Sequence, residues 1–414
     1  MAIRTVVDRA AGLDIAKASL AACVRVPAGR GWRTEKRIFS TTTAGLLDLA
    51  DWLAGYRVRL VGMESTGRYW KPVFYLLEQQ LECWLLNPRH MRAVPGRKTD
   101  MTDAEWICDL VAHGLVRPSF VPGPPIRWLR ELTRRRSVLL RERAREKQRM
   151  QQVLEDAGVK LSVVATDIFG VSGRAIITAL ISGERDEHRL AELARGRMRT
   201  KLPALAEALV GRFGEHHAYL AAQILRHVDM INELVGELNH RIHTEIAPYQ
   251  QQIDLLDTIP GIDQDSAQAI LAEIGPDMHR FPTAAHLASW AGLCPGNNKT
   301  GGKAKPAATR HGNRCLKATC GTAALGAIRT RNRYPNAQFR RVAARRGGKR
   351  ALTAVAHTLL HAAWHVLTTN TTYHDLGPDY FLTRDNPARH RRRAVDILQR
   401  LGYRVTLEPI PTTP

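Results

Sequence analysis

The chain has 414 residues, which is more than one ordinary small domain and predicts two or three domains. Its hydrophobic content of 44% excludes wholesale disorder, and no apolar run is long enough to cross a bilayer. The 61 Lys and Arg against 39 Asp and Glu leave a formal net charge of +22, which indicates a polyanionic partner such as nucleic acid.

Alternating apolar runs and helical patterns predict an α/β domain over residues 1–125. A Pro-rich run at 121–125 then interrupts the chain. The predicted strands span 11–15, 20–26, 37–41, 58–63 and 83–86, and the predicted helices span 46–53, 69–80 and 102–113.

Residues 126–250 are predicted to be a helical section. The segment 127–149 carries ten basic and three acidic residues, and 217–246 repeats apolar residues at helical spacing. Two long antiparallel helices, of a coiled-coil kind that also suits a dimer interface, fit this pattern, with 160–214 as a shorter helical insert. The basic residues of 127–149 either contact an RNA or DNA backbone or form a solvated helix face.

Residues 251–370 are predicted to form a mainly helical C-terminal domain, with helices at 316–328 and 352–367 and loops around 292–302. Thr258-Ile-Pro-Gly-Ile262 before a helical 266–274 resembles a helix-hairpin-helix, in which glycine permits a tight turn whose N–H groups meet a phosphate. The remaining 371–414 are expected to be an irregular basic tail.

The positive charge is segregated along the chain. Residues 278–374 contain no Asp or Glu but 16 Lys and Arg, whereas an Arg-rich genome alone would scatter acids there too. Tyr334 and Phe339 lie among these cations and either stack on a base or pack in a core. Five basic side chains are expected to neutralise phosphates rather than read bases: Lys303, Lys305, Arg310, Arg314 and Lys317.

The cysteines and histidines give little sign of a metal site. The six cysteines include no CxxC spacing, which argues against structural zinc. His357, His361 and His365 follow i,i+4 spacing without an intervening Glu, so we interpret them as structural histidines. Without a signal peptide, a cytoplasmic, nucleoid-associated protein with reduced thiols is expected.

Four acids occupy the ends or beginnings of predicted elements. Asp14 lies in the first strand, Glu64 closes the central strand, and Asp100 and Asp103 open a helix with i,i+3 spacing. Two Mg²⁺ ions need several carboxylates from different elements, as in ribonuclease-H-like folds. Each acid alone also fits a helix cap or a strand edge, so the pattern leaves both interpretations open.

Several motifs resemble the DEDD-type insertion-sequence transposases of the "one-ten" family, also known as bridge-RNA-guided recombinases. In the N-terminal part the motifs are GLDIAK, GMESTGRYW and KTDMTDA. In the C-terminal part they are TIPGI, AGLCPGNN, RHGN and the LGY near the end. Their order and spacing cover nearly the whole chain.

The resemblance implies a RuvC-like nuclease domain, a coiled-coil section and a C-terminal transposase domain. It implies that Asp14, Glu64, Asp100 and Asp103 bind Mg²⁺, and that a C-terminal hydroxyl forms a covalent link to DNA. It also implies a structured guide RNA that pairs with donor and target DNA, and dimers that assemble into a tetramer with shared active sites.

The sequence departs from the family at the nucleophile. The loop Pro295-Gly-Asn-Asn-Lys-Thr-Gly-Gly-Lys303 has Thr300 where the family has serine. A threonine hydroxyl is a competent nucleophile when activated, although its methyl group restricts χ1 and crowds the attack on phosphorus. The alternative is a loop threonine that hydrogen-bonds the backbone.

The sequence therefore predicts phosphoryl transfer on DNA that moves an insertion sequence, with Thr300 as nucleophile and Mg²⁺ at the four acids. Two other functions stay open. One is a Holliday-junction-type nuclease, in which metal-activated water attacks. The other is a nucleic-acid-binding relative that has lost its chemistry.

Overall fold

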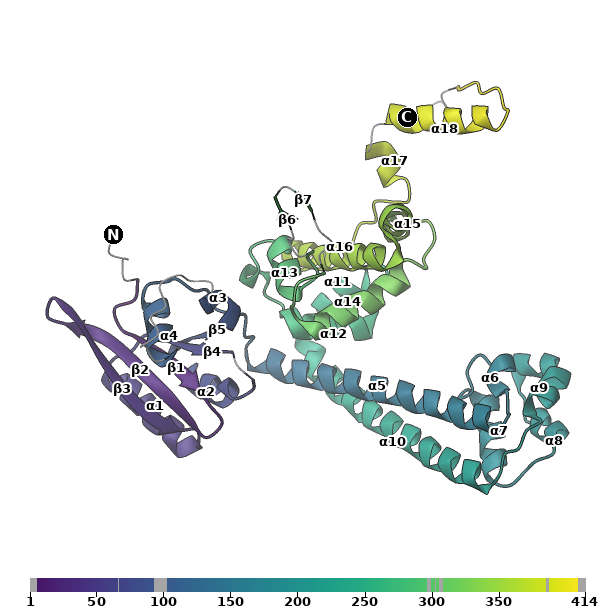
Figure 1. The fold of residues 1–414 in the computed structure, drawn as a ribbon, viewed down its shortest axis with the longest axis horizontal. Helices are drawn as coiled ribbons and strands as arrows, with labels where there is room; N and C mark the ends of the chain where they lie inside the picture. The colour runs from purple at the N-terminus through teal and green to yellow at the C-terminus, as the bar shows by residue number, and fades with distance from the viewer. Residues whose placement is uncertain are drawn as a thin grey trace. The chain divides into compact units, whose positions relative to one another are not determined.

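The computed structural model describes residues 6–65, 67–92, 103–295, 299–301, 303–304, 308–384 and 387–408. It divides into two compact units, Met1–Val121 and Pro122–Pro414 (Figure 1). None of the helices in the described ranges is both long and apolar enough to span a bilayer.

Unit 1 is built on a mixed five-stranded sheet with the order β3-β2-β1-β4-β5 (Figure 1). β2 pairs antiparallel with both β1 and β3, whereas β4 is parallel to β1 and β5 is parallel to β4. The strands are β1 (Ala10–Ile15), β2 (Ser19–Ala28), β3 (Gly31–Ser40), β4 (Leu60–Glu64) and β5 (Glu82–Leu86).

Helices cover both faces of this sheet. On one face, Leu13 and Met63 are buried against Leu49 of α1 and against α2. On the other face, Leu60 packs with Ile107 of α4. Side chains alternate between the faces of a strand, so residues 10, 12 and 14 of β1 share the α4 face. The helices are α1 (Thr43–Gly55), α2 (Trp70–Leu77), α3 (Pro88–Arg92) and α4 (Asp103–Ala112).

The third strand is longer than predicted. It was expected over 37–41, but β3 pairs with β2 over its whole length, from Ser40 opposite Ser19 to Gly31 opposite Ala28. Of its side chains only Phe39 is buried. A strand with two exposed faces lacks the apolar alternation by which a half-buried strand is detected, which explains the missed residues.

Unit 2 begins with two long helices that run antiparallel, α5 (Pro124–Asp156) and α10 (Glu215–Ile246), which we call the arm. Arg136 of α5 bonds Asn239, and Arg143 bonds Asn232, so rising numbers in α5 meet falling numbers in α10. The prediction of two long antiparallel helices is confirmed. Their apolar seam consists of Leu139, Ile231 and Val235 with Leu140, Leu234 and Leu238 beside them.

The insert between the arm helices is a small helical module with its own core. Ile176, Ile177 and Leu205 are fully buried there, together with Met150 and Leu154 from the end of α5. Residues 160–214 are thus helical, as predicted. The module contains α6 (Leu161–Val164), α7 (Val171–Ile181), α8 (Glu187–Glu192) and α9 (Leu202–Leu209).

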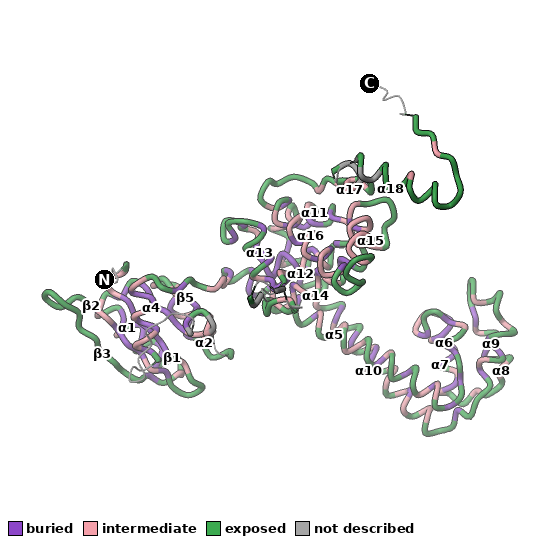
Figure 2. Tube along the Cα trace, turned by 45° about the horizontal axis from the view of Figure 1, so that its top comes forward, coloured by how far each residue is buried: buried purple, intermediate pink, exposed green. Residues whose placement is uncertain are grey.

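The C-terminal helices pack around α12, α14 and α16, which hold most of the buried residues of this region (Figure 2). Small residues such as Ala324 and Ala356 let these helices approach closely. The helices are α11 (Gln250–Asp257), α12 (Gln264–Ile274), α13 (Ala284–Ala291), α14 (Arg314–Ala327), α15 (Tyr334–Arg346) and α16 (Gly348–Thr369).

The turn between α11 and α12 rests on α14. Gly261 has a φ of 84°, and a Cβ there would lie 2.2 Å from the carbonyl oxygen of Ala323. Only glycine fits this combination of a left-handed backbone and a backbone contact. The helix expected over 266–274 is present as part of α12, and one side of the turn before it is used for packing.

The tail was expected to be irregular, and this was wrong. Residues of the tail form α17 (Tyr380–Arg384) and α18 (Pro387–Arg400). Pro387 stands at the first position of α18, where its missing N–H has no intrahelical partner to lose, and Arg400 pairs with Asp396 one turn earlier. The basic run was interpreted by its charge, and the helical spacing of the apolar residues that follow it was missed. The helix α15, which carries Arg340 and Arg341, was also not predicted.

Candidate active site

The central strands bring Asp14 and Glu64 to the same edge of the sheet. β1 and β4 are parallel with Leu13 opposite Met63, so the two acids occupy the next level along the strands. Because Leu13 and Met63 are buried on the α1 face, Asp14 and Glu64 belong to the opposite face, which α4 covers. Two of the acids predicted from sequence therefore lie on neighbouring strands and on one side.

Two glycines let α4 approach this face. A Cβ on Gly12 would lie 2.1 Å from the carbonyl oxygen of Ala104, and one on Gly62 would lie 2.4 Å from the Val111 side chain. Both glycines stand two residues before an acid, on the same face of their strand. The backbone contact at Gly12 sets the first turn of α4, and with it Asp103, against the strand end that carries Asp14.

The three acids influence one another electrostatically. The pKa of Asp14 is raised above its ordinary value, first by partial loss of solvent and then by the negative charges of Asp103 and Glu64. Carboxylates that converge in this way favour a divalent cation, because the cation relieves their repulsion. All three are hard oxygen ligands of the kind that Mg²⁺ prefers.

The fourth predicted acid, Asp100, lies outside the described residues. Within the described ranges, no three His, Cys, Asp or Glu side chains are close enough together to hold one metal ion. Asp14, Glu64 and Asp103 thus lie in one region and influence one another electrostatically, but their side chains are not close enough together to form a complete set of metal ligands. The donor chemistry fits Mg²⁺, and closure of the site depends on more than these three side chains.

Two ion pairs that sequence reasoning missed fasten α4 to the outer strands. Arg25 of β2 contacts Asp109 at 3.0 Å and lies over the ring of Trp32, 4.4 Å from its centroid. Lys36 of β3 contacts Glu105 at 2.6 Å, and this hydrogen bond raises the pKa of Lys36. The lysine is well exposed, so the contact orients the helix more than it stabilises the fold.

Thr300 lies in a short β-hairpin, β6 (Lys299–Thr300) and β7 (Lys303–Ala304), with Gly301 between them at a φ of 57°. The backbone of Thr300 is thereby placed at the end of a strand, next to a turn. Its side chain is outside what the structure describes, so the direction of the hydroxyl is not part of the geometry.

The predicted phosphate-binding residues have different surroundings. Arg310 and Arg314 are exposed just before and at the start of α14. Lys317 is half-buried, and its ammonium group donates a hydrogen bond to the hydroxyl of Thr309. Lys303 is in β7, but its side chain lies outside the described part, as does the whole of Lys305. The structure therefore presents Arg310 and Arg314 to solvent and gives Lys317 an internal partner.

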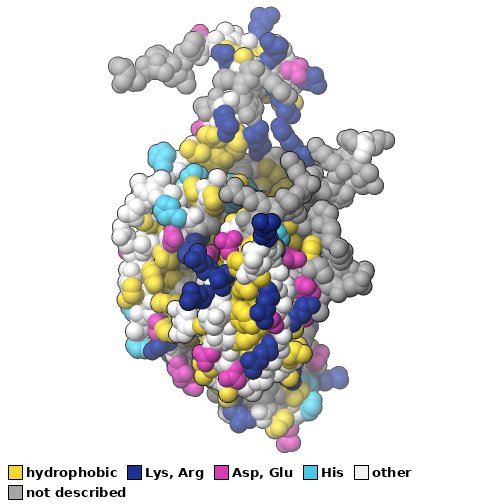
Figure 3. All heavy atoms as spheres, turned by 90° about the vertical axis from the view of Figure 1, so that its left-hand side faces the viewer, with side chains coloured by type: hydrophobic (Ala, Val, Ile, Leu, Met, Phe, Trp, Pro, Cys, Tyr) yellow, Lys and Arg dark blue, Asp and Glu magenta, His cyan; other side chains and the backbone are white. Residues whose placement is uncertain are grey.

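Positive charge is concentrated in the C-terminal helices rather than in unit 1. Residues 1–121 contain 17 Lys and Arg with 12 Asp and Glu, while 278–374 contain 16 and none. On the face in Figure 3, Lys and Arg side chains are interspersed with Asp and Glu instead of forming one continuous patch. The charge asymmetry along the chain therefore indicates the C-terminal helices as the stronger phosphate-binding region.

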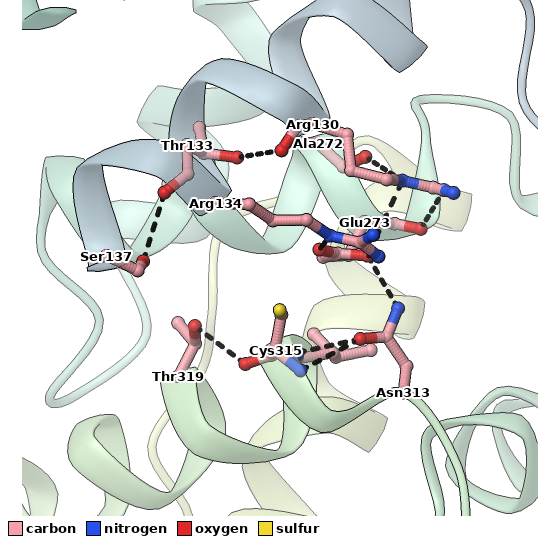
Figure 4. A network of polar contacts seen from close by, with 10 residues as sticks. Arg130, Thr133, Arg134, Ser137, Ala272, Glu273, Asn313, Cys315 and Thr319 are labelled. Carbon is pink, nitrogen blue, oxygen red and sulfur yellow. Dashed lines mark hydrogen bonds and ion pairs between the residues drawn. The ribbon is translucent and has the colours of Figure 1, made fainter. Parts of the chain in front are cut away.

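A buried carboxylate near α14 was not predicted at all. Glu273, at the end of α12, has only 2% of its side chain exposed and receives a bidentate contact from Arg134, at 2.7 and 2.8 Å (Figure 4). Arg130 donates to the backbone oxygens of Ala272 and Glu273. Asn313 donates its amide to the same carboxylate at 2.5 Å. Sequence reasoning had no signal for this group except an acid inside an apolar helix.

The contacts of Glu273 and of Arg136 change the interpretation of the basic arm helix α5. Arg130, Arg134 and Arg136 were expected to meet either nucleic acid or solvent. Instead Arg136, which is almost fully buried, contacts Asp265, Asn239 and Gln268. These arginines fasten α5 to α12, and burial lowers the pKa of Arg136.

Comparison with known proteins matches two regions of the chain. A DEDD-type family model described as a transposase matches residues 11–158, and a model described as transposase IS116/IS110/IS902 family matches residues 253–341. Together they cover more than half of the chain. The first contains Asp14, Glu64, Asp100 and Asp103, and the second contains Thr300.

Individual relatives agree with this assignment. A relative in Sinorhizobium fredii that is named as a transposase is 26% identical over 67% of this chain and 64% of its own length. The transposase for insertion sequence element IS1111A of Coxiella burnetii is 24% identical over 78% of this chain and 81% of its own. The pilin gene-inverting protein of Moraxella bovis is 24% identical over 70% of this chain and 73% of its own.

A DEDD transposase domain implies a ribonuclease-H-like α/β fold, and the mixed sheet of unit 1 with helices on both faces agrees with it. The mostly helical remainder agrees with a separate transposase region. The resemblance seen in the motifs is confirmed by both family models and by the relatives. The chain belongs to the IS110/IS116/IS902 family of transposases, enzymes that recombine DNA.

Proposed function

We propose that this transposase cleaves and rejoins DNA strands to mobilise an insertion sequence, with a covalent protein–DNA intermediate. The observation that carries the proposal is the placement of Asp14, Glu64 and Asp103 on one side of the sheet, where partial loss of solvent and the charges of Asp103 and Glu64 raise the pKa of Asp14. Carboxylates whose charges shift one another's pKa are characteristic of catalytic and metal-binding sites.

Asp14, Glu64, Asp100 and Asp103 would hold Mg²⁺. When bound, Mg²⁺ would polarise the scissile phosphate and neutralise its developing charge. The protein's own contribution is to fix the acids by the β1–β4 register and by the backbone contact between Gly12 and α4. Asp103 at the first turn of α4 belongs to an element that Arg25 and Lys36 hold in place.

Thr300 supplies the nucleophile in this proposal. Its Oγ1 bonds to phosphorus while the bond from phosphorus to the leaving deoxyribose oxygen breaks. The hydroxyl proton leaves to water, and the departing oxygen takes up a proton, so the phosphodiester is conserved as a threonine ester. Rejoining is the reverse attack by another strand's hydroxyl. The turn at Gly301 presents the residue at the end of a hairpin.

Nucleic acid would be held mainly by the basic C-terminal region. Lys303, Lys305, Arg310 and Arg314 would neutralise phosphates, and the turn at 258–262 would add backbone contacts as in a helix-hairpin-helix. A structured guide RNA would select donor and target DNA by base pairing. Dimers that pair into a tetramer would bring the acids and Thr300 to one phosphate, on the nucleoid.

The test is to trap the intermediate. The full-length protein is incubated with Mg²⁺ and a plasmid carrying the element with its flanks, then denatured and digested, and the DNA-linked peptide is identified by mass spectrometry. We expect a DNA adduct on the peptide containing Thr300, retained by Thr300→Ser and absent in Thr300→Ala and Asp14→Asn. The exposed acid Asp48 on α1 provides a matched control, since Asp48→Asn leaves the adduct unchanged.

The other outcomes separate the alternatives. Metal-dependent cleavage without any adduct, unaffected by Thr300→Ala, would indicate a Holliday-junction-type nuclease. Binding without cleavage at any Mg²⁺ concentration would indicate a catalytically decayed relative. Sequencing the co-purified nucleic acid tests the guide separately: one structured RNA from the element's end supports it, and random cellular RNA contradicts it.

A further inference from the structure

The described chain before and after the hairpin that carries Thr300 forms a paired stretch of backbone, residues 292–295 and 308–313, which we call the neck. Pro295 forms an isolated β-bridge with Thr309, and the N–H of Arg310 donates to the carbonyl oxygen of Cys294 at 3.3 Å. At its base the two sides touch, since a Cβ on Gly292 would lie 2.8 Å from the backbone nitrogen of Gly312. The neck is therefore closely paired.

Asn313, the last residue of the neck, has two functions at once. Its side-chain oxygen caps α14 by accepting from the N–H groups of Cys315 and Leu316, both at 3.1 Å. Its side-chain nitrogen donates to Glu273 at 2.5 Å. The amide is thus oriented from both ends, and the start of α14 is tied to the end of α12 (Figure 4).

Glu273 also connects α12 and the start of α14 to helix α5 of the arm. Its buried carboxylate receives both nitrogen donors of Arg134 from α5, and this contact raises the pKa of the arginine. A buried carboxylate with several donors has little freedom to move, because every alternative position leaves a polar group unsatisfied. The chain of contacts runs from α5 through Glu273 and Asn313 to the neck.

We propose that Glu273 and Asn313 are positioning residues, which hold the neck, and so the Thr300 hairpin, in register with the base of the arm for attack on DNA. This inference rests on the proposed role of Thr300. Neither residue touches the reacting atoms, so they act through backbone placement. A displacement of about 1 Å at an attacking group costs up to roughly a hundredfold in rate, and a rigid support therefore matters.

A second ion pair between the same two helices serves as the matched control. Arg136 of α5 contacts Asp265 of α12 at 2.9 Å, and its other hydrogen bonds within the described residues go to α10 and α12. Loss of the Asp265 charge should weaken the α5–α12 attachment without disturbing Asn313. Any effect specific to Glu273 can therefore be separated from a general loosening of the arm.

The first experiment compares Glu273→Gln with Asp265→Asn in the full-length protein. For Glu273→Gln we expect the adduct rate at saturating DNA to fall about tenfold or more, with DNA affinity within roughly twofold of the original. Hydrogen exchange should accelerate at the amides of Cys315 and Leu316. Asp265→Asn should leave both the rate and these amides unchanged. Equal loss of rate in the two variants would overturn the proposal.

The second experiment exchanges donor and acceptor. Asn313→Asp keeps an oxygen to cap α14 but sets two carboxylates against each other, so the adduct rate should fall and then recover at lower pH, when the pair shares a proton. The double variant Asn313→Asp with Glu273→Gln restores a donor and an acceptor between positions 273 and 313, but the glutamine keeps only one acceptor oxygen for Arg134. We expect it to recover part of the rate lost in Asn313→Asp, and no recovery would contradict the proposal.

The outcomes also separate this inference from the proposed function. If the unmodified protein forms no adduct on Thr300, the proposed function fails, while hydrogen exchange still reports whether Glu273 holds the neck. If the adduct forms and Glu273→Gln changes neither rate nor exchange, the positioning inference fails alone.

Discussion

A Cβ atom on Gly12 would lie 2.1 Å from the carbonyl oxygen of Ala104, a distance that real Cβ atoms essentially never reach. Strand β1 and the first turn of α4 therefore meet backbone to backbone. Asp14 follows Gly12 by two residues, and Asp103 immediately precedes Ala104. Because Gly12 has no side chain, β1 and α4 approach closely, and this close approach sets the spacing between Asp14 and Asp103.

Gly12→Ala should consequently damage both stability and activity. The added methyl group has no room unless α4 moves, and we expect a loss of about 3 kcal/mol in the free energy of unfolding. Denaturant unfolding measures this loss. Gly55→Ala, at the exposed end of α1 with open space around it, is the control and should be neutral or slightly stabilising. A harmless Gly12→Ala would show that α4 is not held by this contact.

Removing the charge of Asp14 should stabilise the metal-free protein near neutral pH. A pKa raised in the folded state means that ionisation of Asp14 opposes folding, so its stabilising contribution is present at acid pH and is lost as pH rises through the raised pKa. Asp14→Asn should therefore have a higher Tm than the original at neutral pH, and the difference should shrink on acidification.

Mg²⁺ provides the counterpart of that measurement. It should raise the Tm of the unmodified protein and of Asp48→Asn, but not that of Asp14→Asn. Thermal unfolding with and without Mg²⁺ checks this. An equal rise in all three proteins would mean that the cation binds elsewhere.

Arg310 and Arg314 should behave differently from Lys317 in DNA binding. The two arginines are exposed, so replacing either with Met should reduce the salt dependence of binding by about one phosphate contact. Lys317 donates to Thr309 within the protein. Replacing Lys317 should lower the Tm, and it should change the salt slope less than replacing Arg310 or Arg314 does. Affinity titrations at several salt concentrations, with thermal unfolding beside them, distinguish the two behaviours.

Acid should weaken α16 through His361. Burial, together with the neighbouring His357 and His365, lowers the pKa of His361 to about 4. Because the folded pKa lies below the unfolded one, the stability that neutral His361 provides is present above the unfolded pKa of about 6.5 and is lost as pH falls toward the folded value.

After allowance for solvent screening we expect a loss of about 1 kcal/mol between neutral pH and pH of about 5, and His361→Asn should abolish it. Unfolding at the two pH values measures the loss. The same loss in His361→Asn would assign the effect to other groups.

The sequence predicted the elements in which apolar residues are dense or regularly spaced. β1 and β2 carry apolar residues that are buried on both faces of the sheet, the helical spacing of 217–246 follows from one buried face, and these elements are where they were expected. β3 was shortened because both of its faces are largely exposed. α18 was missed because its few apolar residues follow a dense basic run, although Ile397, Leu398 and Leu401 have helical spacing and are exposed.

Only the parts of the candidate site that depend on local sequence could be predicted. Asp14 and Glu64 could be placed at strand ends, and parallel pairing then brought them together. The Glu273 network could not be predicted, because Arg134, Glu273 and Asn313 are separated by 139 and 40 residues along the chain. Nothing local distinguishes Arg134 from the other arginines of α5. Its role is set by which face of α5 meets α12, which is a matter of packing.

Because the two arm helices are antiparallel, the start of α5 and the end of α10 lie at the same end of the arm. α5 begins against α12, and α10 ends next to α11, so the insert at 160–214 could be opened at a point away from the base of the arm. The exposed turn at Gly183 is such a point, since a side chain there would meet nothing. Two polypeptides split at this turn would each retain one helix of the arm, and the zipper-like seam of Leu139, Ile231 and Val235 would allow them to reassemble into a working whole. The arm thereby makes the protein a candidate for fragment complementation.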